Sequence, residues 1–235
     1  MSRRYHTLLF DMDNTILDFS AAEHNAIVQT LQTFGAEPAS EVVTLYSAIN
    51  DVLWKRLEKG AVSRDEVIHG RFEVLCHALG LPCDGAQWQT VYQSHLCQGH
   101  TYLPGARELL ERLQGQYAIY LLTNGLAATQ HPRLRDSGLE NLVQGTFISE
   151  EIGWQKPDRR FYEVCFSRIP DFDPAAALII GDSLTSDIAG GNNAGIDTCW
   201  YNPAGAVNDR GVHVDYEIRA LSDLEEILTQ PVPHG

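Results

Sequence analysis

Two aspartates, Asp11 and Asp13, stand at the end of a short apolar run near the start of the chain, with Thr15 two residues beyond them. Side chains on a strand alternate between its two faces, so the two carboxylates point the same way where the strand ends. Two like charges held a few ångströms apart repel each other, and proteins usually relieve the repulsion with a bound cation or a shared proton. The pair is therefore a candidate catalytic or metal site, and the alternative is an acidic turn after a strand.

Polar residues also follow three later apolar runs. They are Thr123 and Asn124, then Lys156, and then Asp182, Ser183 and Asp187. Ligands of an open parallel sheet bind beyond the carboxyl ends of its strands, so we expect these side chains to meet Asp11 and Asp13 at one edge. Together they supply carboxylates for a hard cation, one ammonium group and hydroxyl donors, a set that suits a phosphate.

Each of these later residues also has a plainer interpretation. Thr123 and Asp182 could cap the helices that follow them, and Lys156 could be an ordinary charge in solvent. The functional interpretation depends on the convergence of all four segments on one kind of ligand.

The rest of the sequence indicates which elements position these residues. Strand-like apolar runs alternate with helical segments, which is typical of a parallel sheet covered by helices on both faces. The runs cover residues 7–10, 117–122, 146–148, 177–180 and 198–201. Residues 16–100 show helical spacing instead, with a capping box at Ser63 and Glu66. We predict an α/β protein: a Rossmann-like parallel-sheet core over residues 1–15 and 101–235, with an all-α helical cap over 16–100 inserted after the first strand.

Pro132 falls inside the helix expected after Gly125. A proline in a helix removes a backbone hydrogen bond and clashes with the preceding turn, at a cost of ~3 kcal/mol. We therefore expect this helix to start near Pro132 or to bend there.

Composition and charge narrow the class of protein. The net charge of −14 opposes binding to nucleic acid or to an anionic membrane, so a phosphate substrate needs a cation or a lysine close by. Five cysteines without a Cys-x-x-Cys spacing, and histidines without metal-ligand spacing, suggest neither a disulfide framework nor a zinc site. No apolar stretch approaches the ~20 residues of a membrane span. We expect a soluble protein of the reducing cytoplasm, a monomer or a small homo-oligomer.

The four segments together resemble the four motifs of the haloacid dehalogenase superfamily of phosphohydrolases, in their usual order. They are Asp-x-Asp-x-Thr from Asp11, the strand-terminal Thr123, the pair Lys156-Pro157, and Gly-Asp-x-x-x-x-Asp ending at Asp187. The helical insertion is similar to the cap of the type-one members. The resemblance covers essentially the whole chain.

A narrower resemblance points to the pyrimidine 5′-nucleotidase branch of this superfamily. It is carried by Trp54, Arg71 and Phe72 in the cap and by the Leu-Leu-Thr-Asn-Gly run that ends at Gly125. It implies a nucleoside 5′-monophosphate substrate with a pyrimidine base, and Trp54 and Phe72 would then stack on the base. The alternative is that both aromatic residues belong to the core of the cap itself.

The superfamily resemblance also implies catalytic roles. Asp11 would attack phosphorus to form an aspartyl-phosphate, and Asp13 would protonate the departing oxygen and later take a proton from water. Lys156 would offset negative charge, while Thr123 and the N–H groups near Asn124 would hold phosphoryl oxygens.

Mg²⁺ is the cofactor that the resemblance implies. This ion prefers six oxygen ligands and keeps some of its waters. The carboxylates of Asp11 and Asp182 and the backbone carbonyl of Asp13 would be its protein ligands. The residues expected around these ligands are Thr15, Ser183 and Asp187.

Related activities share much of this motif set. A dehalogenase keeps the nucleophile but needs no acid at Asp13, because halide leaves without a proton. A sugar-phosphate phosphatase or a phosphomutase shares all four motifs and differs in how the cap holds the sugar. A phospho-accepting signalling protein, the non-enzyme alternative, also uses aspartate, Mg²⁺, threonine and lysine but lacks a large helical insertion.

Overall fold

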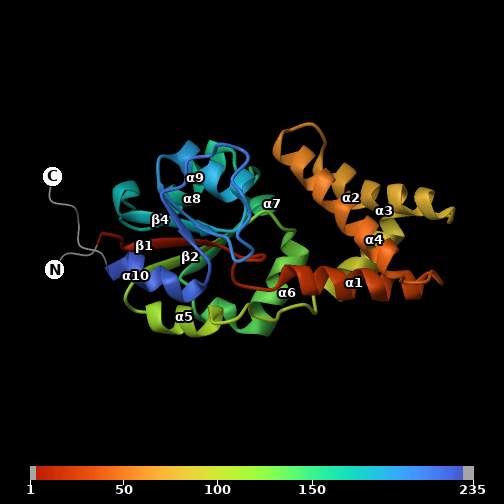
Figure 1. Ribbon diagram of the computed structural model, residues 1–235, viewed down its shortest axis with the longest axis horizontal. Helices are drawn as coiled ribbons and strands as arrows, with labels where there is room; N and C mark the ends of the chain where they lie inside the picture. The colour runs from red at the N-terminus through yellow and green to blue at the C-terminus, as the bar shows by residue number, and fades with distance from the viewer. Residues whose placement is uncertain (1–3, 230–235) are drawn as a thin grey trace. The chain divides into compact units, whose positions relative to one another are not determined.

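The computed structural model describes residues 4–229 and divides the chain into two compact units (Figure 1). The core unit comprises the residues up to Asp18 and from Thr101 onward, and the cap unit comprises Phe19–His100. The two connecting segments pair within the core, since the Asp18 N–H donates to the Thr101 carbonyl over 2.9 Å. Residues 16–18, which the sequence analysis assigned to the cap, therefore lie with the core.

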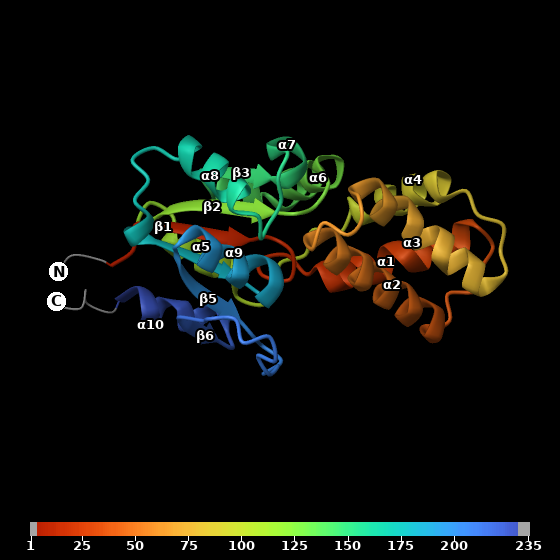
Figure 2. The same ribbon diagram turned by 90° about the horizontal axis from the view of Figure 1, so that it is seen from above.

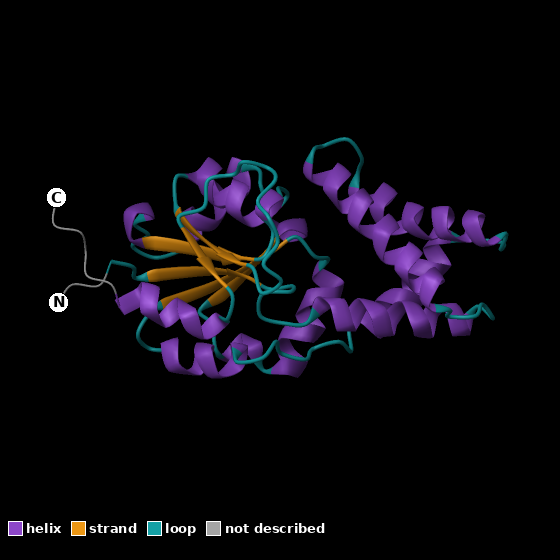
Figure 3. Cartoon of the chain, in the orientation of Figure 1, coloured by secondary structure: helices purple, strands orange, loops and turns teal. Residues whose placement is uncertain are grey.

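A parallel sheet forms the centre of the core unit (Figure 3). Within the described residues it has six strands in the order β3-β2-β1-β4-β5-β6, and each neighbouring pair is parallel. The strands are β1 (Thr7–Asp11), β2 (Ala118–Thr123), β3 (Gly145–Ile148), β4 (Ala177–Gly181), β5 (Asp197–Tyr201) and β6 (Tyr216–Ile218). The predicted α/β class is confirmed. Strand β6 was not predicted, because three residues are too few to show a periodic pattern.

Helices cover both faces of this sheet (Figure 2). Leu8 and Phe10 of β1 pack into an apolar cluster with α5 (Ala106–Leu113) and α10 (Leu224–Thr229). Leu9, between them, packs into the opposite cluster with α8 (Arg159–Arg168). Because both faces are covered, the strand residues are apolar in succession, and this is the pattern that the sequence analysis recognised.

The core unit also contains shorter elements. They are α7 (Ser149–Ile152), α9 (Ala189–Ala194), 3₁₀ turns at Leu139–Asn141, Pro174–Ala176 and Leu221–Asp223, and a π-helical turn at Leu184–Ile188. Among the helices found in residues 4–229, none combines the length and the apolar character needed to cross a membrane.

The cap unit is made of helices packed around their own apolar core. They are α1 (Phe19–Thr33), α2 (Ser40–Glu58), α3 (Arg64–Leu79) and α4 (Gly85–Leu96). Ser63 and Glu66 form the capping box at the start of α3, each accepting a hydrogen bond from the other's backbone N–H. Phe72 is fully buried, with its ring against Tyr46 and Tyr92. A ring enclosed in this way belongs to the core of the cap, the alternative considered above for this residue.

Helix α6 (Ala127–Ser137) contains Pro132 in its interior. The helix begins at Ala127, so the start expected near Pro132 is wrong. Its first turn forms before the proline, since the Gln130 N–H donates to the Leu126 carbonyl over 2.8 Å. The proline removes one helical hydrogen bond, and the side chains of Gln130 and Arg133 on either side of it are tied to the core unit and hold the helix in place.

Candidate active site

Three neighbouring strands end at one edge of the sheet and bring the predicted residues together. Strand β1 ends at Asp11, β2 ends at Thr123, and β4 ends one residue before Asp182. Strand β1 lies between the other two, with Asp11 in register with Leu122 of β2. The three strand ends therefore form the floor of a common site.

The Lys156 ammonium group is the centre of this site. Its Nζ donates to Asp11 Oδ1 over 2.5 Å, to Asp187 Oδ1 over 2.7 Å and to the Leu122 carbonyl over 2.8 Å. The side chain is only 2% exposed. Burial by itself would lower the pKa of Lys156, but Asp11 and Asp187 outweigh it and raise that pKa. The lysine is therefore a permanent buried cation with all three donors used, and not the solvated charge of the plainer interpretation.

Asn124 fixes the backbone of Lys156. Its Nδ2 donates to the Lys156 carbonyl over 2.9 Å, and its Oδ1 accepts from the Lys156 N–H over 2.9 Å. A side-chain amide that binds both the N–H and the carbonyl of one residue fixes the backbone on both sides of its Cα. The sequence analysis expected the N–H groups near Asn124 to hold phosphoryl oxygens, whereas the Asn124 side chain itself is engaged with the lysine backbone.

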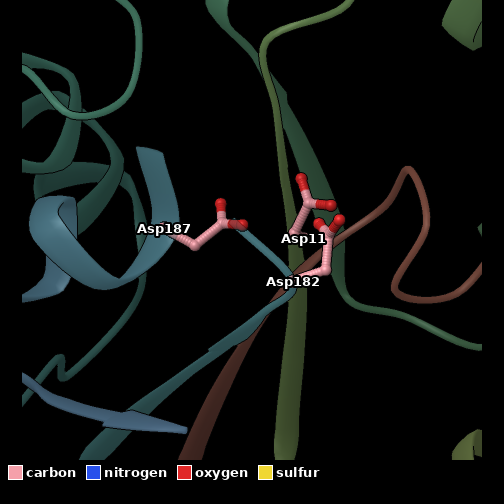
Figure 4. Close-up of side chains that lie close together, drawn as sticks. All are labelled: Asp11, Asp182 and Asp187. Atoms are coloured by element: carbon pink, nitrogen blue, oxygen red, sulfur yellow. The ribbon is translucent and has the colours of Figure 1, made fainter. Parts of the chain in front are cut away.

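Three carboxylates, those of Asp11, Asp182 and Asp187, lie close together at this site (Figure 4). One oxygen from each of Asp11, Asp182 and Asp187 lies within 4.8 Å of the other two. The sequence analysis put Asp11 and Asp182 at the metal and Asp187 around it, and the structure brings all three into one cluster.

Burial and crowding raise the pKa values of two of these carboxyls, Asp182 and Asp11. Burial is the main reason that the pKa of Asp182 rises to about 7, and the charge on Asp187 raises it further. Burial also raises the pKa of Asp11, against the opposing effect of Lys156. With three negative charges and one positive charge, the ionised cluster carries a net charge of −2. A divalent cation would balance this charge, and the all-oxygen donor set fits the Mg²⁺ that the sequence resemblance implies.

Asp187 reaches the cluster because Gly181 leaves room for it. A Cβ on Gly181 would lie 2.5 Å from the Asp187 Cβ, far inside normal contact. The second Asp187 oxygen, Oδ2, accepts from the Ser183 N–H over 3.0 Å, and the Ser183 hydroxyl in turn accepts from the Ser186 N–H. Ser183 therefore shapes the turn that presents Asp187, and both Asp187 oxygens are held by hydrogen bonds.

Thr123 is buried at the end of β2, where its hydroxyl accepts two hydrogen bonds. The donors are the Gly125 N–H at 3.1 Å and the Gln130 Nε2 at 2.7 Å. The residue that caps α6 is Leu126, so Thr123 does not act as the helix cap of the plainer interpretation.

Asp13 does not point its carboxylate into the cluster. Its Oδ1 accepts from Arg133 Nη1 over 2.5 Å, and its Oδ2 accepts from Gln130 Nε2 over 2.6 Å. Both partners lie on α6, and sequence reasoning missed them. Their spacing of three residues places two polar side chains on one helix face, but this pattern does not show that the face meets Asp13.

Thr15, the last residue of the first motif, is completely buried. Its hydroxyl finds no hydrogen-bond partner among the residues that the structure describes. A buried hydroxyl without a partner is costly, which is consistent with a place in a site that binds a ligand or water.

Comparison with known proteins assigns the chain to a family. A sequence model of the haloacid dehalogenase-like hydrolases matches residues 5–195, a range that contains every site residue described above.

Curated relatives match over nearly their whole lengths. YfnB, a HAD-hydrolase of Bacillus subtilis, is 44% identical, with 96% of each chain covered. The pyrimidine 5′-nucleotidase PynA of Streptococcus pneumoniae is 42% identical, with 97% of each chain covered. The pyrimidine 5′-nucleotidase YjjG of Escherichia coli is 30% identical, with 96% of this chain and 98% of that chain covered. A crystal structure of YfnB bound to magnesium has a TM-score of 0.91 and covers 96% of this chain and 99% of that one.

Proposed function

The chain belongs to the haloacid dehalogenase-like hydrolase family, and from this premise we propose that it is a Mg²⁺-dependent phosphomonoesterase acting through an aspartyl-phosphate on Asp11. We further infer that its substrates are nucleoside 5′-monophosphates, with pyrimidine bases preferred. The observation that carries the proposal is the threefold hydrogen bonding of the buried Lys156, which fixes Asp11 at the sheet edge.

Asp11 is the nucleophile in this proposal. Lys156 holds Oδ1, so the carboxylate is fixed and Oδ2 is the atom that attacks phosphorus. The new bond from Oδ2 to phosphorus forms as the bond from phosphorus to the leaving oxygen breaks, and water then hydrolyses the acyl phosphate. The ammonium group also offsets the negative charge of the phosphoryl oxygens in the transition state.

The ligands proposed for Mg²⁺ are the carboxylates of Asp11 and Asp182 and the backbone carbonyl of Asp13. Asp187 already uses Oδ1 on Lys156 and Oδ2 on the Ser183 N–H, so we assign it to holding the lysine. The bound ion would supply positive charge that polarises and orients the phosphoryl group.

Thr123 is assigned to the phosphoryl oxygens. A hydroxyl that accepts two hydrogen bonds still has its own hydrogen to donate. The N–H groups that follow Asn124 lie at the start of α6, where a helix favours an anion. The Asn124 side chain contributes indirectly, by holding the backbone of Lys156.

Asp13 is assigned to proton transfer. It would give a proton to the nucleoside oxygen as that oxygen leaves, and would take one from the water that hydrolyses the aspartyl-phosphate. A 5′-alkoxide is a poor leaving group, so its departure depends on this proton.

Two observations support a pyrimidine nucleotide as substrate. PynA and YjjG, both named pyrimidine 5′-nucleotidases, align with this chain from end to end. In the cap, Trp54 on α2 is half-buried and so is not enclosed as Phe72 is, and a residue that stacks on a base must be reachable. Phe72 is enclosed in the cap core and is not part of the proposal.

A screen of phosphate release tests the proposal. The wild-type protein would be assayed with Mg²⁺ on pyrimidine and purine nucleoside 5′-monophosphates, sugar phosphates and 4-nitrophenyl phosphate. We expect kcat/KM to be highest for the pyrimidine nucleotides and chelation to abolish all activity. Faster hydrolysis of sugar phosphates than of every pyrimidine nucleotide would overturn the substrate assignment, and full activity in excess chelator would overturn the metal assignment.

A further inference from the structure

We propose that Gln130 and Arg133 are positioning residues that set the orientation of the Asp13 carboxylate and couple it to Thr123. The inference rests on the proposed function, in which Asp13 exchanges a proton with the leaving group. It assigns a role to two side chains that lie outside the four motifs, and we call the pair the Asp13 clamp.

Each clamp residue holds one of the two Asp13 oxygens. Arg133 Nη1 donates to Oδ1 over 2.5 Å, and Gln130 Nε2 donates to Oδ2 over 2.6 Å. The two clamp residues also bind each other, because Arg133 Nη1 donates to Gln130 Oε1 over 2.8 Å. Rotation of the Asp13 carboxylate would therefore break at least one charge-assisted hydrogen bond. One oxygen can exchange its donor for a substrate atom while the other stays held.

The second partner of Gln130 is a phosphate-site residue. Its Nε2 also donates to Thr123 Oγ1 over 2.7 Å, so one amide nitrogen joins Asp13 to Thr123. Thr123 ends β2 and Asp13 follows the end of β1 by two residues. In the proposed reaction Asp13 faces the leaving oxygen and Thr123 faces the transferred phosphoryl group. A fixed distance between them is what in-line transfer requires.

The burial of the clamp argues against a purely structural role. The Arg133 side chain is 0% exposed, although it carries a charge that is costly to remove from water. The guanidinium contacts the carboxylate of Asp13, whose own side chain remains 24% exposed. A buried guanidinium is thus paired with a carboxylate that solvent can reach.

Gly125 provides an independent observation. A Cβ at this position would lie 2.7 Å from Gln130 Cδ and 2.9 Å from Gln130 Cγ. The glycine of the Thr-Asn-Gly run thus leaves the space that the Gln130 side chain occupies. Gly125→Ala should push Gln130 away from Asp13 without removing any hydrogen-bonding group from the clamp.

The test compares leaving groups. The variants are Gln130→Met, Arg133→Met, Arg133→Lys and Gly125→Ala, and the matched control is Arg135→Met, an exposed arginine on the same helix. For each, kcat/KM would be measured with 4-nitrophenyl phosphate, whose leaving group needs little protonation, and with the best alkyl phosphate or nucleotide of the wild-type screen. This parameter reports the steps up to departure of the leaving group.

We expect losses of roughly ten- to a hundredfold with the poor leaving group and less than about threefold with 4-nitrophenol, as for a misplaced proton donor. Arg133→Lys should recover part of the loss, and none of the changes should reduce kcat/KM further in an Asp13→Asn background. Equal losses with both leaving groups, or a full further loss in the Asp13→Asn background, would overturn the inference. Inactive wild-type protein would instead overturn the proposed function, so the two failures are distinguishable.

Discussion

Lys156 Nζ lies 2.5 Å from Asp11 Oδ1, although the two residues are 145 positions apart in the chain. The contact forms because β1 and β2 are neighbours in the sheet and Asn124, directly after β2, holds both the N–H and the carbonyl of Lys156. The same ammonium binds Asp187, which folds back over Gly181. The sheet thus converts three distant segments into one charged centre.

Removal of the Lys156 ammonium should reduce both activity and stability. In Lys156→Met, Asp11 and Asp187 lose their shared cation, and loss of one partner from a buried ion pair costs ~3–5 kcal/mol. We expect kcat to fall on the order of 10²–10³-fold, the usual effect of losing one charge-stabilising donor. Steady-state kinetics and thermal unfolding would measure the two effects.

In the control, Lys55→Met, only an exposed ion pair with Asp51 is lost, and both quantities should stay near wild type. A Lys156→Met protein as active and as stable as this control would refute the assignment.

The stability of the metal-free protein should depend on pH through Asp182. Its pKa is about 7 in the folded protein against an ordinary value of 3.8, so the native state holds more protons than the unfolded chain between these values. The free energy of unfolding should therefore fall as pH rises from about 4 to about 7. Asp11, whose pKa is also raised, acts in the same direction. The contribution of Lys156 is complete below its ordinary pKa of 10.5 and stays constant across this window.

Mg²⁺ should offset the loss of stability at the higher pH, because the ion binds ionised carboxylates. At one fixed Mg²⁺ concentration, we expect the rise in Tm over a chelated sample to be larger at about pH 7.5 than at about pH 5. Thermal unfolding at the two pH values measures it. An equal rise at both would show that ionisation of the cluster does not limit metal binding.

The two aromatic residues of the cap should respond differently to truncation. Trp54→Ala should raise KM for pyrimidine nucleotides at least several-fold, since base stacking contributes ~1–3 kcal/mol, and should spare 4-nitrophenyl phosphate. Phe72→Ala should instead destabilise the protein by ~3–5 kcal/mol, because it empties a space in the cap core. Kinetics on both substrates and thermal unfolding separate these outcomes. Val52→Ala, an exposed change on the same helix, is the control for Trp54. Parallel losses on both substrates in Trp54→Ala would argue against a base contact.

Much of the fold and of the site could be predicted, because the ends of buried strands are easy to recognise in the sequence. In a sheet covered on both faces, consecutive apolar residues mark a strand, and the first polar residue marks its end. Asp11, Thr123 and Asp182 were found in this way, and the family resemblance drawn from their motifs is confirmed. Lys156 was found only through its motif, since nothing local distinguishes a buried lysine from a solvated one.

The clamp residues were beyond such reasoning. Gln130 and Arg133 look like ordinary polar positions of a surface helix, and the nearby Pro132 suggested that the helix had not yet begun. Their burial depends on α6 packing against the first motif, a contact between segments about 120 residues apart. Local periodicity reports which residues share a helix face, and does not report whether that face meets a carboxylate or solvent.

The central claim, that Asp11 is the covalent nucleophile, is tested most directly by the kcat of Asp11→Asn. Asparagine keeps the size of the side chain and can still accept a hydrogen bond from Lys156, so the fold and its Tm should persist. An amide is not a nucleophile toward phosphorus, and we therefore expect turnover of the best substrate to be abolished. Turnover by a folded Asp11→Asn protein within tenfold of wild type would contradict the account.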